Sequence, residues 1–369
     1  AGWSVSPSGR MVIYIDAHTG ALHSIRADAL NDTVVGTVTN GKAPVAGFWA
    51  TPAGMAIAGG IAWSPDNMRV AYVAQNGSET ALHVMTATGS ADTIARLISG
   101  GFFGRPLWSA DSISIAFATT HSGTQSISVY NITTSHLLTI AAQSDASDGA
   151  AMADDLAWLP GDGGALTWST QDNGAVTGIF RADANTSDSA VRLTPEGVRY
   201  AVAGVSASGT WLLSRDTVLE EIAAGQSSPQ FVATLAHPIT QICWAPSGNV
   251  AAVVAGDSLA LLTSSHAVAA IAHGLTAQSV VAWSSDSTAL AWQSGRVVMS
   301  ARIAQGSTSM QKMVAQEAGV LALMWSPDGQ SLAAQAPSGV VLMSADGAQM
   351  REVDGAETSG TQFAWSLSG

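Results

Sequence analysis

The chain has 369 residues, of which 47% are hydrophobic and only 11% are charged, so it contains ample apolar material for an extended core. An average soluble protein carries about 25% charged residues. The formal net charge of −13 argues against nucleic acid and against anionic lipid as partners, because an acidic surface repels phosphate groups. The single cysteine excludes an internal disulfide framework.

A five-residue pattern recurs along the chain, and its clearest copy, residues 325–329, reads Trp-Ser-Pro-Asp-Gly. Copies of varying quality begin at positions 5, 63, 108, 158, 205, 244, 283 and 325, and a last one begins at 365. Among all-β repeats, a period of about 40 to 50 residues is typical of propeller blades. The first interval is longer because it holds an uncharged stretch, residues 43–65, whose glycines and prolines predict an inserted loop rather than a membrane span.

Each interval divides into four predicted strands separated by turn residues. In the interval that begins at Trp63, the proline of the pattern and Asp66-Asn67 predict a first turn, and Asn76-Gly77 predicts a hairpin. The strands expected there are 61–64, 69–73, 82–85 and 93–98. Elsewhere, continuously apolar strands such as 250–254 indicate sheets that are buried on both faces, as in stacked blades.

The sequence therefore predicts an all-β fold, a single closed β-propeller over residues 1–369, with eight four-stranded blades and seven as the alternative. The repeated tryptophan is expected to wedge between neighbouring blades, where truncation to alanine costs about 3–5 kcal/mol. The ring is expected to close through its N- and C-terminal strands. In the economical solution, residues 361–369 complete the first blade, although residues 2–6 compete for the same inner position.

The repeat resembles that of the TolB-like family of propellers, whose blades carry Trp-Ser-Pro-Asp-Gly before a strand. Residues 325–329 match fully, and the copies at 63, 108, 244 and 283 match in part. The family includes periplasmic scaffold proteins and the non-catalytic gating propellers of prolyl-oligopeptidase-like peptidases. The resemblance therefore implies the fold, whereas fold likeness alone does not assign a function. Propellers of the WD type are a weaker match, because no blade ends in Trp-Asp.

Motifs for catalysis are absent from the sequence. Residues 256–259 read Gly-Asp-Ser-Leu, but the first two form a predicted hairpin turn between strands rather than the strand-to-helix turn that exposes a serine nucleophile. The eight histidines show no metal-binding spacing, so no zinc site is expected. Cys243 lies in an apolar run and is expected to be a buried, inert thiol.

Binding residues are expected in loops on one face, where the hairpins between second and third strands lie beside the connections between blades. Aromatic and arginine side chains are typical anchors of protein contacts. The candidates are Phe48, Trp49, Phe102, Phe103, Arg105, Arg199 and Tyr200. The alternative is that these side chains fold back and cap the channel.

No cofactor is required by any motif, and calcium is the one ion that the sequence suggests. Its oxygen ligands would come from one acidic loop, 144–155, although their spacing matches no known calcium loop and a solvated loop is the simpler interpretation. The carboxylates concerned are Asp145, Asp148, Asp154 and Asp155.

The leading functional hypothesis is a non-enzymatic scaffold propeller that binds another protein or peptide. We expect it in the periplasm, the cell envelope or outside a bacterium, without insertion into the membrane. Two enzymatic alternatives stay open: the substrate-gating propeller of a peptidase, and a propeller hydrolase or lyase with acidic groups converging in the channel.

Overall fold

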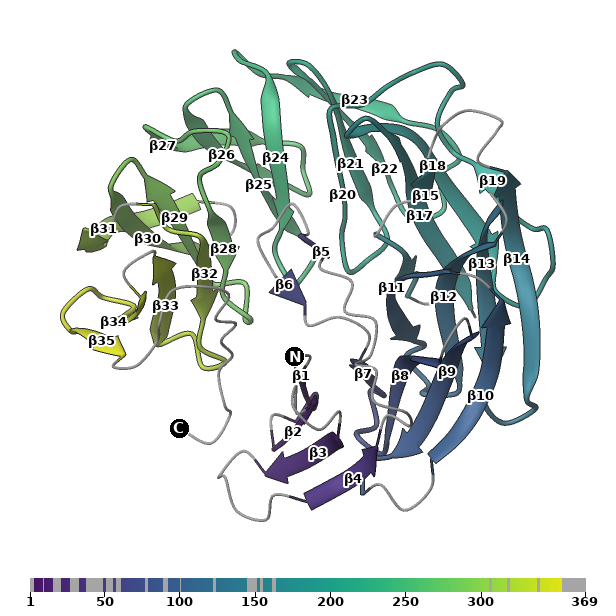
Figure 1. Ribbon diagram of the computed structural model, residues 1–369. Helices are drawn as coiled ribbons and strands as arrows, with labels where there is room; N and C mark the ends of the chain where they lie inside the picture. Colours follow the sequence, from purple (N-terminus) through teal and green to yellow (C-terminus); the bar gives the residue numbers. More distant parts are fainter. Residues whose placement is uncertain are drawn as a thin grey trace.

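All regular structure in the described part of the protein is β-strand, in a computed structural model of the chain (Figure 1). The residues that the structure describes are 3–8, 10–15, 21–26, 33–37, 49–50, 56–57, 61–76, 79–88, 92–99, 101–121, 124–144, 151–152, 155–160, 164–304, 307–316, 319–336 and 339–353. Within these ranges the strands form eight antiparallel sheets of four or five strands and one two-stranded hairpin. The predicted all-β class and the repetition of four-stranded sheets are confirmed.

The first four sheets come from the first half of the chain and are numbered in chain order. Sheet 1 contains β1 (Trp3–Val5), β2 (Met11–Ile15), β3 (Ala21–Arg26) and β4 (Thr33–Thr37), and is followed by the hairpin β5 (Trp49–Ala50) and β6 (Ala56–Ile57). Sheet 2 contains β7 (Ile61–Trp63), β8 (Arg69–Asn76), β9 (Glu79–Thr86) and β10 (Asp92–Ser99). Sheet 3 contains β11 (Gly101–Trp108), β12 (Ser114–His121), β13 (Thr124–Asn131) and β14 (His136–Ser144). Sheet 4 contains β15 (Ala151–Met152), β16 (Ala157–Trp158), β17 (Ala165–Asp172), β18 (Ala175–Asp183) and β19 (Val191–Arg192).

The second half of the chain supplies the other four sheets. Sheet 5 contains β20 (Val202–Val205), β21 (Trp211–Arg215), β22 (Val218–Ile222) and β23 (Gln230–Thr234). Sheet 6 contains β24 (Ile239–Trp244), β25 (Val250–Ala255), β26 (Ser258–Thr263) and β27 (Val268–His273). Sheet 7 contains β28 (Val281–Trp283), β29 (Ala289–Ser294), β30 (Val297–Ala304) and β31 (Ser307–Gln316). Sheet 8 contains β32 (Ala322–Trp325), β33 (Ser331–Ala336), β34 (Gly339–Ser344) and β35 (Met350–Val353).

The sheets follow one another around an arc, with first strands toward its middle and fourth strands at its outside (Figure 1). First strands of neighbouring sheets touch: β1 with β7, β7 with β11, β20 with β24, β24 with β28, and β28 with β32. The arrangement has a local cause, since in seven of the eight sheets each strand pairs with the next one along the chain, and every pair is antiparallel.

The Trp-Ser-Pro-Asp-Gly pattern forms the turn between the first and second strands. Ser326 Oγ donates a hydrogen bond to Asp328 Oδ1 (2.5 Å) and accepts one from the backbone N–H of Ser331 (2.8 Å), which fixes the start of β33. The fifth residue of the pattern has positive φ, +66° at Gly329 and +62° at Asn67, which explains why Gly, Asn or Ser occupies this position. The same serine–aspartate bond recurs at Ser64–Asp66, Ser109–Asp111 and Ser284–Asp286.

In sheets 3, 4, 6, 7 and 8 the indole of the repeat joins the sheet to the one before it. Trp283 Nε1 donates to the carbonyl oxygen of Cys243, the residue before Trp244, at 3.0 Å. Equivalent bonds, from the indole of one sheet to the first strand of the preceding sheet, are Trp108–Ala62, Trp158–Leu107, Trp244–Gly204 and Trp325–Ala282. The predicted wedging of the tryptophans between neighbouring blades is thereby confirmed.

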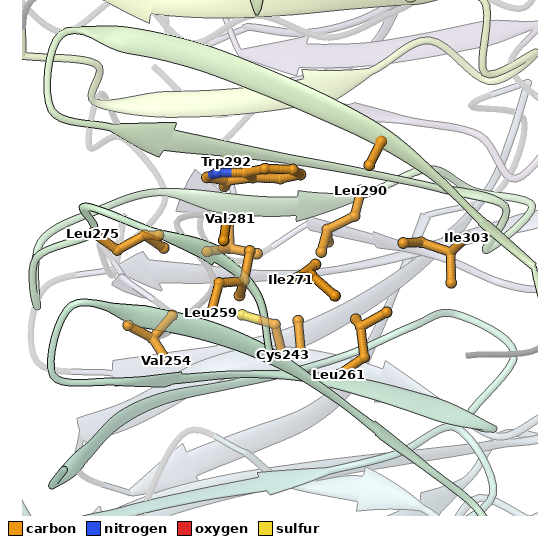
Figure 2. Packing of buried hydrophobic residues seen from close by; sticks show 13 residues of the cluster. Cys243, Val254, Leu259, Leu261, Ile271, Leu275, Val281, Leu290, Trp292 and Ile303 are labelled. Atoms are coloured by element: carbon orange, nitrogen blue, oxygen red, sulfur yellow. The ribbon is translucent and has the colours of Figure 1, made fainter. Parts of the chain in front are cut away.

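Apolar residues fill the spaces between consecutive sheets, so the core is divided among these interfaces. Figure 2 shows one such cluster, in which Cys243, Val254 and Leu259 of sheet 6 meet Leu290 and Trp292 of sheet 7. All five of these side chains are less than 9% exposed. Both faces of an inner sheet are therefore buried, which accounts for the continuously apolar strand at 250–254.

Three expectations need correction or fall outside the described residues. The inner position of sheet 1 is held by β1, which pairs with β2, so the solution in which the C-terminal strand takes that position is wrong. Residues 361–369 themselves lie outside the described residues. Within the predicted inserted loop at 43–65, Trp49–Ala50 and Ala56–Ile57 form the hairpin β5–β6, which Figure 1 draws in the middle of the arc.

Candidate functional site

The hairpins between second and third strands lie beside the connections between sheets, as the sequence predicts, and together they form what we call the loop face. Arg199, in the connection to sheet 5, reaches the β17–β18 hairpin of sheet 4. His237, in the next connection, packs so closely on the β25–β26 hairpin that a Cβ on Gly256 would lie 2.7 Å from the histidine Cβ. Ser294 Oγ, at the β29–β30 hairpin, donates to the carbonyl oxygen of His273 (3.0 Å).

Arg199 and Tyr200 are neighbours in sequence but have different surroundings. The Arg199 guanidinium donates to the Asp172 carboxylate (2.6 Å) and to the Asp172 carbonyl oxygen (3.0 Å), and its side chain is still 52% exposed. Tyr200 is 1% exposed, and its backbone pairs with that of Val176. Burial and the nearby Glu220 carboxylate raise the pKa of Tyr200 to about 12. Of this pair, only Arg199 presents its side chain to solvent.

The aromatic segment before Trp108 is a strand and not the loop that the sequence analysis expected. Gly101–Phe103 pair with Ala118–Thr120 of β12, and the register shifts between Phe103 and Leu107. The reason is that β12 and β13 are eight residues long, so the inner strand has pairing partners well beyond Trp108. Phe102, Phe103 and Arg105 thus belong to β11, and Trp49 belongs to β5, whereas Phe48 lies outside the described residues.

Asp155 is the one member of the predicted calcium set that the structure describes, since Asp145, Asp148 and Asp154 lie outside the described residues. Its Oδ1 accepts the backbone N–H of Ser169 at 2.9 Å. The inner strand of sheet 4 is split there, because Met152 pairs with Thr170 and Ala157 pairs with Thr167. The carboxylate therefore replaces a missing rung of the sheet, and burial raises its pKa. No group of three or more metal-ligating side chains occurs among the residues that the structure describes.

Ser258 and His273 are hydrogen bonded at the loop face, with 3.0 Å between Ser258 Oγ and His273 Nδ1. They are directly opposite residues of β26 and β27, so ordinary cross-strand pairing explains the contact. The carboxylate beside them, Asp257, also accepts from Ser258 Oγ (3.3 Å) rather than orienting the imidazole. The Gly-Asp-Ser-Leu segment is a hairpin between two strands, as predicted, and lacks the geometry of a catalytic triad.

Cys243 is 7% exposed, and burial raises the pKa of its thiol to about 11. At neutral pH the thiolate is then scarce, which removes the nucleophilic form of the side chain. The expectation of a buried, inert thiol is confirmed.

Exposed apolar side chains escaped the sequence analysis, and three of them lie at the two rims where the loops and pattern turns are. Leu321, in the connection to sheet 8 and therefore on the loop face, is 57% exposed. Met68 (64% exposed) and Ile113 (39%) follow the pattern turns of sheets 2 and 3 at the opposite rim. Met68 and Ile113 are each a single apolar residue among turn residues, and Leu321 lies in the apolar run 320–325, so hydrophobic periodicity could not distinguish these positions from core positions.

Comparisons with known proteins support the fold and give no family. The sequence matches no protein-family model and no curated protein. The structure is similar to a crystal structure described as a eukaryotic initiation factor, with a TM-score of 0.61 at 12% identity over 95% of this chain and 87% of that chain. Likeness at this identity shows a shared propeller fold and nothing more.

Two further solved structures align less well. The mitotic checkpoint complex gives a TM-score of 0.47 at 16% identity, over 84% of this chain and 91% of that chain. TolB from Acinetobacter baumannii gives 0.37 at 17% identity, over 69% of this chain and 61% of that chain. The TolB-like repeat therefore stays a prediction from the sequence. In the described ranges there is also no helix of sufficient length and apolar character to cross a membrane.

Proposed function

We propose that this chain is a closed propeller of eight blades that binds a protein or peptide through its loop face, as a scaffold in a bacterial envelope or extracellular assembly. The eight consecutive sheets, and the tryptophan hydrogen bonds that join five neighbouring pairs of them, support the ring. Ring folds with variable loops are rigid supports for binding surfaces.

The observation that carries the binding proposal is the state of Arg199. Its guanidinium is held in place by two bonds to Asp172 and yet remains half exposed, so a partner meets a cation that has already lost much of its conformational freedom. An exposed apolar side chain, Leu321, lies on the same face. The charge-free insertion that carries Trp49 adds aromatic and apolar residues of the kind found at protein interfaces. Calcium binding by residues 144–155 stays a separate prediction.

The test is capture of a partner from the envelope fraction of the source organism, using immobilised wild-type protein and the double variant Trp49→Ala/Arg199→Ala. We expect the wild type to retain a stoichiometric protein partner and the double variant to lose it. The matched control is Arg69→Ala, which removes an exposed arginine paired with Asp66 at the opposite rim.

The melting temperature separates binding from folding in this experiment. An exposed ion pair contributes at most about 1 kcal/mol, so we expect little change in either variant. Retention of the partner by the double variant would exclude the loop face, and a large fall in melting temperature would place these residues in the core. A wild type that captures no protein would favour the enzymatic alternatives.

A further inference from the structure

A cavity of about 440 Å³ lies between sheets 7 and 8, at the rim of the pattern turns and away from the loop face. Its volume is within the range of about 300 to 1,000 Å³ that is typical of small-molecule sites. Sheet 7 contributes Ala289, Ser300, Ala301 and Arg302. Sheet 8 contributes Trp325 and residues of two turns, Gly329, Gln330, Ser344, Ala345 and Asp346.

The cavity lies where two side chains of sheet 7, Ala289 and Ser300, are smaller than the side chains at the same positions of sheet 6. Ala289 pairs with Arg302 in sheet 7, and Val250 pairs with Thr263 at the same register in sheet 6. Two rungs further along, on the same face of the sheet, Ser300 pairs with Ala291, whereas Leu261 pairs with Ala252 in sheet 6. Leu261 fills the space between sheets 6 and 7, and Val250 packs against the same cluster. The changes from Val to Ala and from Leu to Ser remove apolar volume that the turns of sheet 8 do not replace.

The register comparison extends to the other sheets. The position of Ala289 is occupied by Met11, Arg69, Ser114, Ala165, Val250 and Ser331 in sheets 1, 2, 3, 4, 6 and 8. Among these, alanine recurs only at Ala165, and Ala165 lines a cavity of about 470 Å³ beside residues Gly225, Gln226 and Ser227 of sheet 5. Alanine at this rung therefore lines both of these cavities, which makes the cavity at Ala165 a comparison site for the cavity at Ala289.

Arg302 gives the cavity of sheet 7 its chemistry. Among the described residues, its guanidinium makes no hydrogen bond or ion pair, whereas Arg69, Arg199 and Arg215 are each paired with a carboxylate. Arg10, Arg296 and Arg351 are likewise unpaired in the described part of the chain, but none of them lines this cavity, whereas the exposed Arg302 stands at its wall. The acidic group in the lining, Asp346, accepts bonds from Ser344 Oγ (2.6 Å) and from the backbone N–H of Ala348 (3.0 Å), which hold its carboxylate within the turn.

We propose that the cavity between sheets 7 and 8 binds a small organic carboxylate whose charged group pairs with Arg302 and whose apolar body lies between Ala289 and Trp325. Guanidinium groups bind carboxylates through paired hydrogen bonds. The apolar wall formed by an alanine and an indole favours a hydrocarbon or aromatic body. This site is distinct from the loop face, so it does not depend on the proposed protein partner.

The test uses two probes of the same shape, 4-phenylbutyrate and its neutral amide, 4-phenylbutyramide, in calorimetric titrations of the full chain. We expect saturable binding of the carboxylate and binding of the amide that is about tenfold weaker, since a hydrogen bond to a charged group is stronger than one to a neutral group. Arg302→Gln should remove this preference. Ala289→Val, which restores the residue found in sheet 6, should weaken both probes about tenfold by filling the cavity.

Ala165→Val is the matched control, because it fills the comparison cavity and should leave both affinities as in the wild type. Melting temperatures verify that all three variants fold. The proposal is overturned if the wild type shows no saturable binding of 4-phenylbutyrate at about 10 mM. It is equally overturned if the acid and the amide bind alike, or if Arg302→Gln or Ala289→Val binds the acid as tightly as the wild type does.

Discussion

At the scale of single residues, the tryptophans divide into two kinds that differ in one hydrogen bond. The indole N–H of Trp283 donates to Cys243 O in the preceding sheet. Trp292, nine positions later, is fully buried, and within the described ranges its Nε1 has no hydrogen-bond partner. The first N–H joins two sheets, whereas the second is a desolvated donor that costs stability.

This difference predicts opposite effects of removing the indole N–H. Benzothienylalanine keeps the shape of tryptophan and lacks the N–H group. At position 283 we expect it to lower the free energy of unfolding by about 1 kcal/mol, because a buried hydrogen bond is lost. At position 292 we expect no loss or a gain, because no bond is broken. Urea unfolding of the two substituted proteins measures both values, and equal losses at the two positions would contradict the assignment.

At the scale of elements, sheet 4 is the irregular member, because two short strands, β15 and β16, take the place of one inner strand. The Asp155 carboxylate completes the rung between them by accepting the Ser169 N–H. Burial raises the pKa of Asp155, so the folded state holds its proton more tightly than the unfolded chain does. The contribution of this group to stability is therefore lost as the pH rises above its unfolded value of 3.8 and through the folded value.

Asp155→Asn should accordingly stabilise the protein at neutral pH, because the amide oxygen still accepts from Ser169 and carries no charge. We expect the variant to exceed the wild type in free energy of unfolding at pH 7, and the difference to shrink as the pH is lowered toward 4, because the raised pKa favours the neutral, protonated carboxyl of the wild type. Denaturant unfolding at both pH values checks this. A difference that is independent of pH would show that burial of the charge is not the cause.

The elements also show why some of the structure could be predicted from the sequence and some could not. The pattern turns were predictable because Ser326, Asp328 and Gly329 act locally, through a side-chain hydrogen bond and a positive φ. The strand at Gly101–Arg105 was not, since glycines on either side suggested a loop and the length of β12, a distant partner, decided the outcome. Burial of Tyr200 likewise depends on its pairing with Val176, which no local pattern encodes.

Among the candidate site residues, Arg199 was placed correctly because its position follows from topology alone. A connection between sheets must begin at the loop face, so an arginine in it lies there whatever its neighbours are. Its bond to Asp172 and the exposure of Leu321 required the packed structure, since both depend on residues far away in sequence. The cavity at Ala289 was also hidden, because it appears only when the registers of different sheets are compared.

At the scale of the whole molecule, the net charge of −13 acts against a compact fold. Carboxylates outnumber cations, so their mutual repulsion destabilises the folded state, and salt screens that repulsion. We expect the melting temperature at pH 7 to rise between about 0.01 M and 0.5 M sodium chloride. The control is the same comparison at pH 4.8, the isoelectric point of the sequence, where the rise should vanish. A melting temperature at pH 7 that is unaffected by salt would show that the charges are too dispersed to matter.

The tryptophan hydrogen bonds have a consequence for how such a chain can change its length. A repeat that begins with tryptophan can donate through its own indole and accept through the carbonyl just before that indole, as Trp283 and Ala282 do, whereas the repeat that begins with Val205 only accepts, through Gly204. Such a repeat therefore supplies the donor at its interface with the preceding sheet and the acceptor at its interface with the following sheet. Because these donors and acceptors are alike from repeat to repeat, one repeat can take the place of another. Duplication in the gene of a whole repeat that begins with tryptophan would add a complete interface, in which the indole donor and the carbonyl acceptor both have partners. A duplication that begins or ends within a repeat would instead leave an indole N–H or a carbonyl oxygen without its partner. Recombination with its crossover points at the tryptophan positions would thus add or remove whole blades and keep the hydrogen bonds between the remaining blades intact.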